Sequence, residues 1–217
     1  MDIGVLTVVT AVLVALALRA WYRAYNRRTL AGAGSSRFTW PAVLTVAVLV
    51  AGGFEVGHHV RQDLATEALR AVTDVDGAHA DCARFSDELF NVSQYQGYVY
   101  YDGSNAAHLR RDVCIDLWTY AHGGQRNPSD SEIFAVHVVT HEAMHINGIR
   151  SEAQAECTAM QLSHLVAEEL GASPEQARRL QAKYFEEYYP HQRSDYRSGA
   201  CTEGGAMDID PERTEFP

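Results

Sequence analysis

Two apolar runs near the N-terminus dominate the hydrophobic pattern of the chain. Residues 3–18 and 38–54 carry no charged side chain, and aromatic residues lie just after the first run and at the start of the second. A bilayer-spanning helix needs about 20 apolar residues, and Trp and Tyr favour the membrane interface. The runs therefore predict two transmembrane helices, at about 3–22 and 38–56.

Each run also has an alternative interpretation. The first could be a signal peptide, but its start, Met1-Asp2, lacks the basic residue that such peptides carry. The second is marginal in length and could be a helix buried in a protein core. In both cases we expect a transmembrane helix.

The charges around the two runs predict their orientation. Only one acidic residue, Asp2, precedes residue 40, whereas five arginines do: Arg19, Arg23, Arg27, Arg28 and Arg37. Short basic loops stay in the cytoplasm. We therefore expect a multi-pass protein of the cell membrane, with a lipid-contacting anchor at 1–57, an Arg-rich cytoplasmic loop, and an extracytoplasmic domain at 58–217.

The four cysteines all lie in this second part, at Cys82, Cys114, Cys157 and Cys201. An even number outside the cytoplasm predicts two disulfides, with three possible pairings. If the helix expected near 174–189 folds back, Cys201 returns close to Cys157. We therefore favour Cys157–Cys201 and Cys82–Cys114.

Beyond the anchor the pattern is mainly helical, which predicts a mostly helical α+β domain. Between residues 59 and 121 it indicates helices at 59–77, 79–93 and 110–121, and strands at 95–101 and 106–109. Asp76-Gly77 marks the end of the first helix.

Three further helices are delimited by capping signals. Ser129 with Glu132 predicts the start of a helix that runs to about Asn147 and ends at Gly148. Ser151 with Gln154 starts a helix ending at Gly171, and Ser173-Pro174 starts one that reaches about Tyr189. The tail from 191 to 217 is expected to be irregular.

The first of these helices carries the strongest chemical signal, the HExxH motif of residues 141–145. On a helix, His141 and His145 share one face and can bind one metal ion. Glu142 lies about 100° further round, where it can act as general base on a zinc-bound water without being a ligand. This arrangement suits a zinc hydrolase with an open coordination position.

The third ligand must come from another segment, and Glu152 at the start of the next helix is expected to supply it. Glu156, one turn later, is expected to accept the second ring N–H of a ligand histidine and so fix its tautomer. His137 lies about 12 Å along the helix from His145, at 1.5 Å per residue. It is therefore expected in the pocket or behind the ligands.

These residues resemble the gluzincin metallopeptidases. Residues 152–156 are similar to the Glu-x-x-Ala-Asp segment of membrane-bound CAAX-protease-like gluzincins, and the chain as a whole resembles small membrane-anchored actinobacterial metallopeptidases. The resemblance implies a minimal zincin-like fold, Glu152 as ligand and Glu156 as support. The chain departs from that pattern in having Glu156 where the family has Asp, and in a much shorter connection between the two helices. A metzincin match fails, because their third histidine would fall at Ser151.

Other residues are less clearly assigned. An oxyanion donor is expected downstream, where five candidates lie: Tyr184, Tyr188, Tyr189, His191 and Tyr196. His164 is expected to be an ordinary helix residue. The strand at 95–101 could pair with an extended substrate or be a structural hairpin.

The sequence thus predicts a membrane-anchored metallopeptidase with one Zn²⁺ per chain, acting on a peptide or protein substrate. A net charge of −10 argues against nucleic-acid binding. The alternatives are a non-catalytic zinc-binding envelope domain with a structural or partner-binding role, and a zinc hydrolase that acts on a non-peptide bond.

Overall fold

The structure is a computed structural model that describes residues 4–26, 38–84, 95–212 and 216–217. Its internal contacts divide the chain into two units, 1–60 and 61–217. Each unit is described by itself below.

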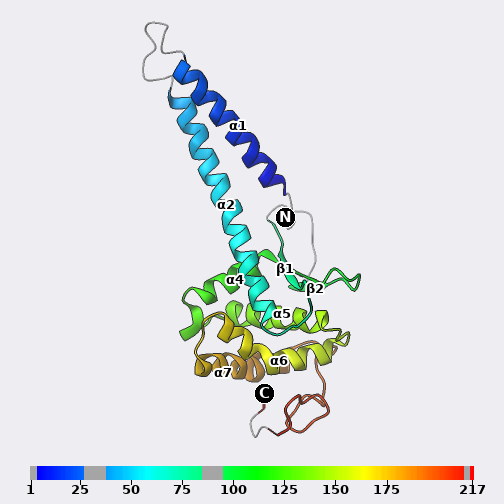
Figure 1. The fold of residues 1–217 in the computed structure, drawn as a ribbon. Helices are drawn as coiled ribbons and strands as arrows, with labels where there is room; N and C mark the ends of the chain where they lie inside the picture. The colour runs from blue at the N-terminus through cyan, green and yellow to red at the C-terminus, as the bar shows by residue number, and fades with distance from the viewer. Residues whose placement is uncertain (1–3, 27–37, 85–94, 213–215) are drawn as a thin grey trace. The chain divides into compact units, whose positions relative to one another are not determined.

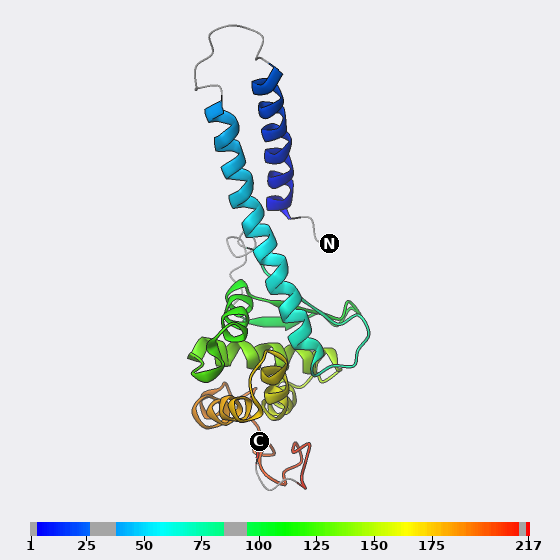
Figure 2. The ribbon, with the colours of Figure 1, turned by 60° about the vertical axis from the view of Figure 1, so that its left-hand side comes forward.

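The first unit consists of two antiparallel helices, α1 (Val5–Asn26) and the first part of α2 (Thr39–Arg70) (Figures 1 and 2). Both helices are long and apolar enough to cross a membrane. Two polar contacts join them: the Thr7 hydroxyl donates to the Glu55 carboxylate, and the Trp21 indole donates to Thr45 at 3.0 Å.

Helix α2 is one continuous helix of 32 residues. At 1.5 Å per residue it is about 48 Å long, more than the roughly 30 Å of a bilayer core. Its C-terminal part is the helix predicted from residue 59, and it continues without a break from the second apolar run. That prediction placed the end too late, because the helix stops at Arg70 and a turn leads to Gly77, whose φ is +77°.

The second unit contains a three-stranded sheet of β1 (His79–Cys82), β2 (Gly97–Val99) and β3 (Ala106–Leu109), in the order β1-β3-β2. β1 is parallel to β3 and β2 is antiparallel to it. The strand predicted at 106–109 is confirmed, and β2 occupies the middle of the predicted 95–101.

The helix predicted at 79–93 is wrong where the structure describes it. His79–Cys82 is a strand, and the remainder of the prediction from 85 onward lies outside the described residues. Ala80 and Cys82 are buried and alternate with more exposed neighbours, which is the period of a strand. Pairing with β3, a long-range contact, outweighed the local helical pattern.

Four helices follow: α4 (Arg111–Ala121), α5 (Asp130–Ile146), α6 (Glu152–Glu169) and α7 (Pro174–Lys183). They confirm the predicted helices, although the last one gives way to a wide π-turn over Tyr184–Tyr188 and a 3-10 turn over Tyr189–His191. No regular element is assigned after His191 in the described part of the tail.

The predicted capping residues are found at the starts of α5, α6 and α7. Ser129 and Glu132 make a reciprocal capping box at the start of α5, and Gly148 follows its end with φ +93°. Ser151 accepts a hydrogen bond from the backbone of Gln154. A second reciprocal box, Ser173 with Gln176, starts α7.

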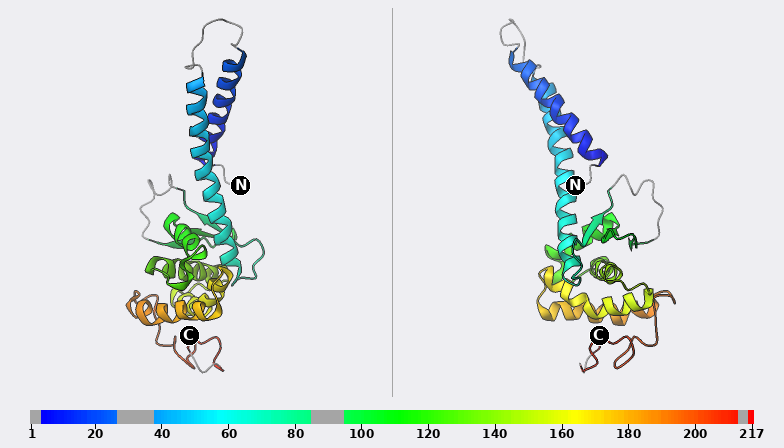
Figure 3. Two further views of the ribbon diagram at one scale, coloured as in Figure 1. Left: turned by 90° about the vertical axis from the view of Figure 1, so that its left-hand side faces the viewer. Right: turned by 45° about the vertical axis from the view of Figure 1, so that its right-hand side comes forward.

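Helix α5 is the central element of the second unit. It lies between the sheet and α4 on one side and α6 on the other (Figures 1 and 3). Its apolar residues Ile133, Val136, Val139 and Ala143 are all fully buried. Because α5 is covered on both sides, its polar residues are also held inside the protein.

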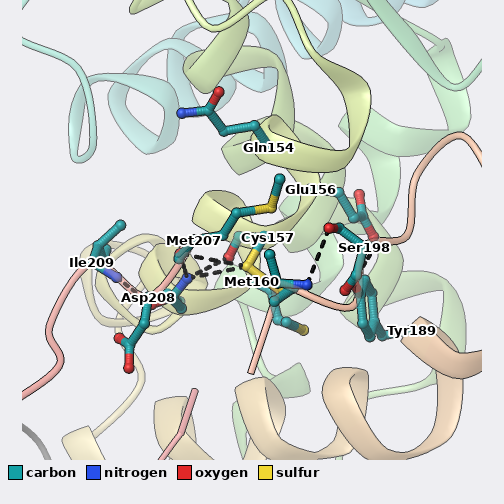
Figure 4. Close-up of a disulfide and its surroundings, with 12 residues drawn as sticks. Gln154, Glu156, Cys157, Met160, Tyr189, Ser198, Met207, Asp208 and Ile209 are labelled. Atoms are coloured by element: carbon teal, nitrogen blue, oxygen red, sulfur yellow. Dashed lines mark hydrogen bonds between the residues drawn. A yellow bond between two sulfur atoms is a disulfide. The ribbon is translucent and has the colours of Figure 1, made fainter. Parts of the chain in front are cut away.

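Two disulfides fix the edges of this unit, and both are the predicted pairs. Cys82–Cys114 joins β1 to α4, and Cys157–Cys201 joins α6 to the tail. Around the second bridge the tail makes further contacts (Figure 4): Gln161 donates to the Met207 carbonyl at 2.9 Å, and the backbone N–H of Ser198 donates to the Tyr189 hydroxyl at 3.1 Å.

Replacing both Cys157 and Cys201 by Ser should destabilise the second unit. The bridge closes a segment with a sequence separation of 44. Loss of the cross-link should lower the free energy of unfolding by about 4 kcal/mol, because the unfolded chain regains entropy. Thermal unfolding of the full chain in non-ionic detergent measures the change. Unfolding at the same temperature as the parent protein would contradict the prediction.

Candidate functional site

The two histidines of the HExxH motif point to the same place. His141 and His145 are one turn apart on α5, each only 6% exposed, and their Nε2 atoms lie 3.1 Å apart. Helical spacing produces this geometry because residues four apart lie on one face.

Hydrogen bonds on the far side of each ring define which nitrogen carries the proton. His141 Nδ1 lies 3.0 Å from Glu156 Oε2, and His145 Nδ1 lies 2.6 Å from the Ile149 carbonyl. Carboxylate and carbonyl oxygens only accept, so both Nδ1 atoms donate. In the neutral rings each Nε2 atom therefore carries a lone pair, and the two lone pairs are directed toward each other.

Glu152 completes a triangle with these two nitrogens. Its Oε2 lies 3.1 Å from His141 Nε2 and 3.4 Å from His145 Nε2. Zinc held tetrahedrally at 2.0–2.2 Å keeps its ligand atoms about 3.3 Å apart. The three donor atoms thus match the spacing that a single zinc ion requires, and they form one of the two clusters among the described residues that could hold a metal.

The electrostatics of the triangle are those of a cation site. Burial disfavours the charged form of His141, but hydrogen bonds to Glu152 and Glu156 outweigh it and raise its pKa to about 9. Conversely, the hydrogen bond from His141 lowers the pKa of the Glu152 carboxyl. Both shifts show that positive charge is favoured between these groups, whether a proton or a metal ion supplies it.

Glu156 lies behind the triangle, 2% exposed, as expected for a supporting residue. One of its oxygens accepts from His141 and from His137 Nε2 at 2.9 Å, and the other accepts from the Tyr184 hydroxyl at 2.6 Å. Burial opposes ionisation, but the two histidines hold the pKa of the Glu156 carboxyl well below its usual range.

His137 is also placed as expected, in the pocket and behind the ligands. Its ring stacks on Tyr184 with centroids 3.6 Å apart. His137, His141 and Glu156 form the second cluster that could hold a metal. Two ring N–H donors converging on one carboxylate oxygen account for that cluster without an ion, so we assign it a supporting role.

Glu142 differs from Glu152 and Glu156 because one of its buried carboxylate oxygens has no hydrogen-bond partner among the described residues. It is 4% exposed, and its Oε2 has no hydrogen-bond partner within the described segments. Burial, opposed by the charge of His141 and assisted by that of Glu152, raises the pKa of the Glu142 carboxyl to about 7.

Gly97 of β2 leaves space for the Glu142 side chain, and it was not among the residues predicted for the site. A Cβ atom at this position would lie 2.7 Å from Glu142 Oε1 and 2.8 Å from its Cγ, too close for any side chain. A glycine inside an aromatic, β-branched strand is the available signal, since it often marks close backbone approach. The edge strand of the sheet is thus packed directly against the carboxylate.

Of the five possible oxyanion donors, only Tyr196 is placed beside the triangle. Its ring stacks on His141 with centroids 5.6 Å apart, and its pKa is raised by burial, by the charge of Glu152 and by a hydrogen bond to the Glu152 carboxylate. Tyr184 is used by Glu156, Tyr189 is bonded to Ser198, and Tyr188 is bonded to Asp130. His191 ends the 3-10 turn.

Two further side chains complete the surroundings. The Tyr101 hydroxyl lies 3.0 Å from His145 Nδ1, a neighbour that the sequence analysis missed because it comes from the end of the aromatic strand segment. His164 is a buried residue of α6. Its Nδ1 lies 3.1 Å from the Gln161 carbonyl, and it belongs to neither cluster.

A pocket of about 570 Å³ opens beside the triangle. Its lining includes His141, Glu142 and Gly97 near the ligands, and Tyr196 from the tail. The site therefore combines three convergent ligand atoms, a buried unpartnered carboxylate and a space large enough for part of a substrate.

No protein-family model matches the chain, and neither a curated protein nor a solved structure matches it.

Replacing Tyr184 by Phe should destabilise the site. The Tyr184 hydroxyl donates to one buried oxygen of Glu156 and accepts from the half-buried Gln192 at 2.8 Å, so its loss leaves that Glu156 oxygen without its partner. A hydrogen bond to a charged group is worth about 1.5–3 kcal/mol. Thermal unfolding should show a lower midpoint than the parent. The matched control, Tyr100→Phe, removes the hydroxyl of an exposed tyrosine and should leave the midpoint unchanged; equal midpoints for both variants would contradict the assignment.

Proposed function

We propose that the chain is a membrane-anchored, zinc-dependent metallopeptidase. The observation that carries this proposal is the triangle of His141 Nε2, His145 Nε2 and Glu152 Oε2, with edges of 3.1–3.4 Å, next to a buried carboxylate that has no partner. A site with three protein ligands leaves a fourth position for substrate or water, whereas structural zinc sites fill all four.

The residues divide into ligands and supports. His141, His145 and Glu152 would hold the ion, and two neutral histidines with one carboxylate would leave it with a net charge of +1. Glu156 and the Ile149 carbonyl orient the two imidazoles through their Nδ1 protons. When bound, zinc supplies Lewis acidity for carbonyl polarisation and water activation.

Glu142 is the proton carrier of the reaction. As the water oxygen attacks the peptide carbonyl carbon, Glu142 accepts the proton that the water loses. When the C–N bond breaks, it delivers that proton to the leaving amine nitrogen. A pKa of about 7 suits both steps, because general acid–base catalysis is most efficient when the pKa lies near the working pH.

The substrate backbone is held by the edge of the sheet. β2 is one of the two edge strands of the described sheet and is paired with β3 alone, and its Gly97 lies directly against Glu142. An extended peptide added to this edge brings its carbonyl groups close to the proton carrier. Tyr196, which stacks on His141 and is hydrogen-bonded to Glu152, is our candidate donor to the oxyanion.

Zinc content and activity should separate in the Glu142→Gln variant. The full chain, purified in non-ionic detergent, should contain about one zinc per chain by mass spectrometry. Glu142→Gln should retain the zinc but lose about 100- to 10,000-fold of its peptidase kcat, since the ligands remain while the base is removed. The matched control is Glu169→Gln, an exposed carboxylate at the end of α6, which should keep both properties.

Other outcomes would favour the alternatives. A folded chain without zinc would end the proposal. Zinc without hydrolysis of any peptide, with equal stability of Glu142→Gln and the parent, would indicate a non-catalytic zinc-binding domain.

The proposal includes an extracytoplasmic position for the site, supported by the two disulfides and the arginine-rich connection between the apolar helices. In intact cells, Ser104→Cys in the second unit should react with a membrane-impermeant maleimide. Ser35→Cys, in the connection between α1 and α2, should react only with a permeant one. The opposite labelling pattern would invert the topology.

A further inference from the structure

The pocket beside the candidate zinc site continues well beyond the triangle, between α4 and α5. Near the triangle it is lined by His141 and Glu142, and farther along by Asp116 of α4 and Ser131 of α5. From Ser131 to Glu142 helix α5 rises about 16 Å, at 1.5 Å per residue. This distance exceeds the length of a single side chain, so the Ser131 end would receive the side chain of a substrate residue bound beside Phe134 and Val138, away from Glu142 itself.

The wall between these two ends is apolar. Phe134, Ala135 and Val138 line it from α5, and Val113 lines it from α4. On α5 these residues follow the helical period from Ser131 to Glu142, so they form one continuous stripe along the pocket. The stripe suits an aliphatic stem.

At the far end of the pocket, the Asp116 carboxylate has no basic partner among the described residues. Asp116 accepts a hydrogen bond from Ser131, and the nearby carboxylates of Asp112 and Glu132 add to the negative potential around it. Throughout residues 95–212 and the other described ranges, no basic side chain forms an ion pair with Asp116.

The other charged residues of the pocket are already engaged. Asp112 pairs with Arg110 at 2.6 Å, and Arg193 pairs with Asp195 at 2.8 Å. Glu156 is bonded to His137 and His141.

Two buried polar atoms of pocket residues also lack partners within the described chain. They are Glu142 Oε2 and His137 Nδ1, from residues only 4% and 2% exposed. Unpartnered polar groups at this depth are costly in a protein that is complete without a ligand. Together with Asp116 they indicate that the pocket is built to receive one.

We propose that this pocket is a specificity subsite for a lysine or arginine side chain of the substrate, whose aliphatic stem packs on Val113, Phe134 and Val138 and whose cationic head group donates to Asp116. A long, amphipathic and cationic side chain matches the apolar wall and the charge of the pocket. The inference rests on the proposed peptidase function and names its substrate class.

Fluorogenic peptides test this specificity in the full chain in non-ionic detergent. Each position around the scissile bond is varied between lysine, norleucine and glutamate; norleucine keeps the four-carbon stem without the charge. At one position lysine should raise kcat/KM about tenfold or more over norleucine, and glutamate should be the poorest of the three. A lysine-to-norleucine ratio near one at every position would overturn the inference.

Substitutions identify the residue responsible. Asp116→Asn, which keeps the size of the side chain, should bring the lysine-to-norleucine ratio close to one. Asp63→Asn removes the same charge from an exposed position on α2 and should leave the ratio at its parental value. If Asp116→Asn retains the parental ratio, the head group is not bound by Asp116 and the inference fails.

A binding measurement separates this inference from the peptidase proposal. Fluorescence anisotropy with the zinc-loaded Glu142→Gln variant compares labelled lysine and norleucine peptides, with and without Asp116→Asn. Tighter binding of the lysine peptide that depends on Asp116 supports the subsite even if no peptide is hydrolysed, a result that would sink only the peptidase. Hydrolysis without any preference in rate or binding would sink only the subsite.

Discussion

The buried carboxylate of Glu156 is the interaction on which the candidate site depends. It joins three elements, because it accepts hydrogen bonds from His137 and His141 of α5 and from Tyr184 of the π-turn, while belonging itself to α6. A buried carboxylate is stable only when its lone pairs are satisfied, so these partners hold the helices in one relative position. With α5 and α6 held in this way, Glu152, one turn before Glu156 on α6, lies against His141 and His145.

The same interaction decides the electrostatics of the site. The hydrogen bond from His141 Nδ1 to Glu156 leaves Nε2 as a lone pair in the neutral ring, and the Ile149 carbonyl does the same for His145. Two lone pairs and the Glu152 carboxylate then converge within 3.4 Å of one another, which is unfavourable without positive charge between them. The folded protein therefore maintains an arrangement that favours a cation, and the core formed around α5 supplies the stability for it.

Local signals in the sequence were sufficient for the helices and for the His/Glu cluster that could hold a metal, but not for the parts formed by distant segments. The capping residues Ser129 and Ser173 and the terminal Gly148 define helix ends because their effects reach only a few residues. The spacing of His141, His145, Glu152 and Glu156 is likewise local to two helices. In contrast, β1 was predicted as a helix since its structure depends on pairing with β3, and Gly97 and Tyr101 contact the motif from residues more than 40 positions earlier.

The two disulfides connect these local and long-range features. Cys114 is adjacent to Val113 on the wall of the pocket, and Cys157 is adjacent to Glu156 beneath the ligands. Their partners lie in a four-residue strand and in a tail that has no regular element in its described part. The tail also carries Tyr196, which stacks on His141. Each covalent bridge thus ties a weakly structured segment to a helix that lines the site, so that in an oxidising compartment the pocket walls and the ligands are held by the same framework.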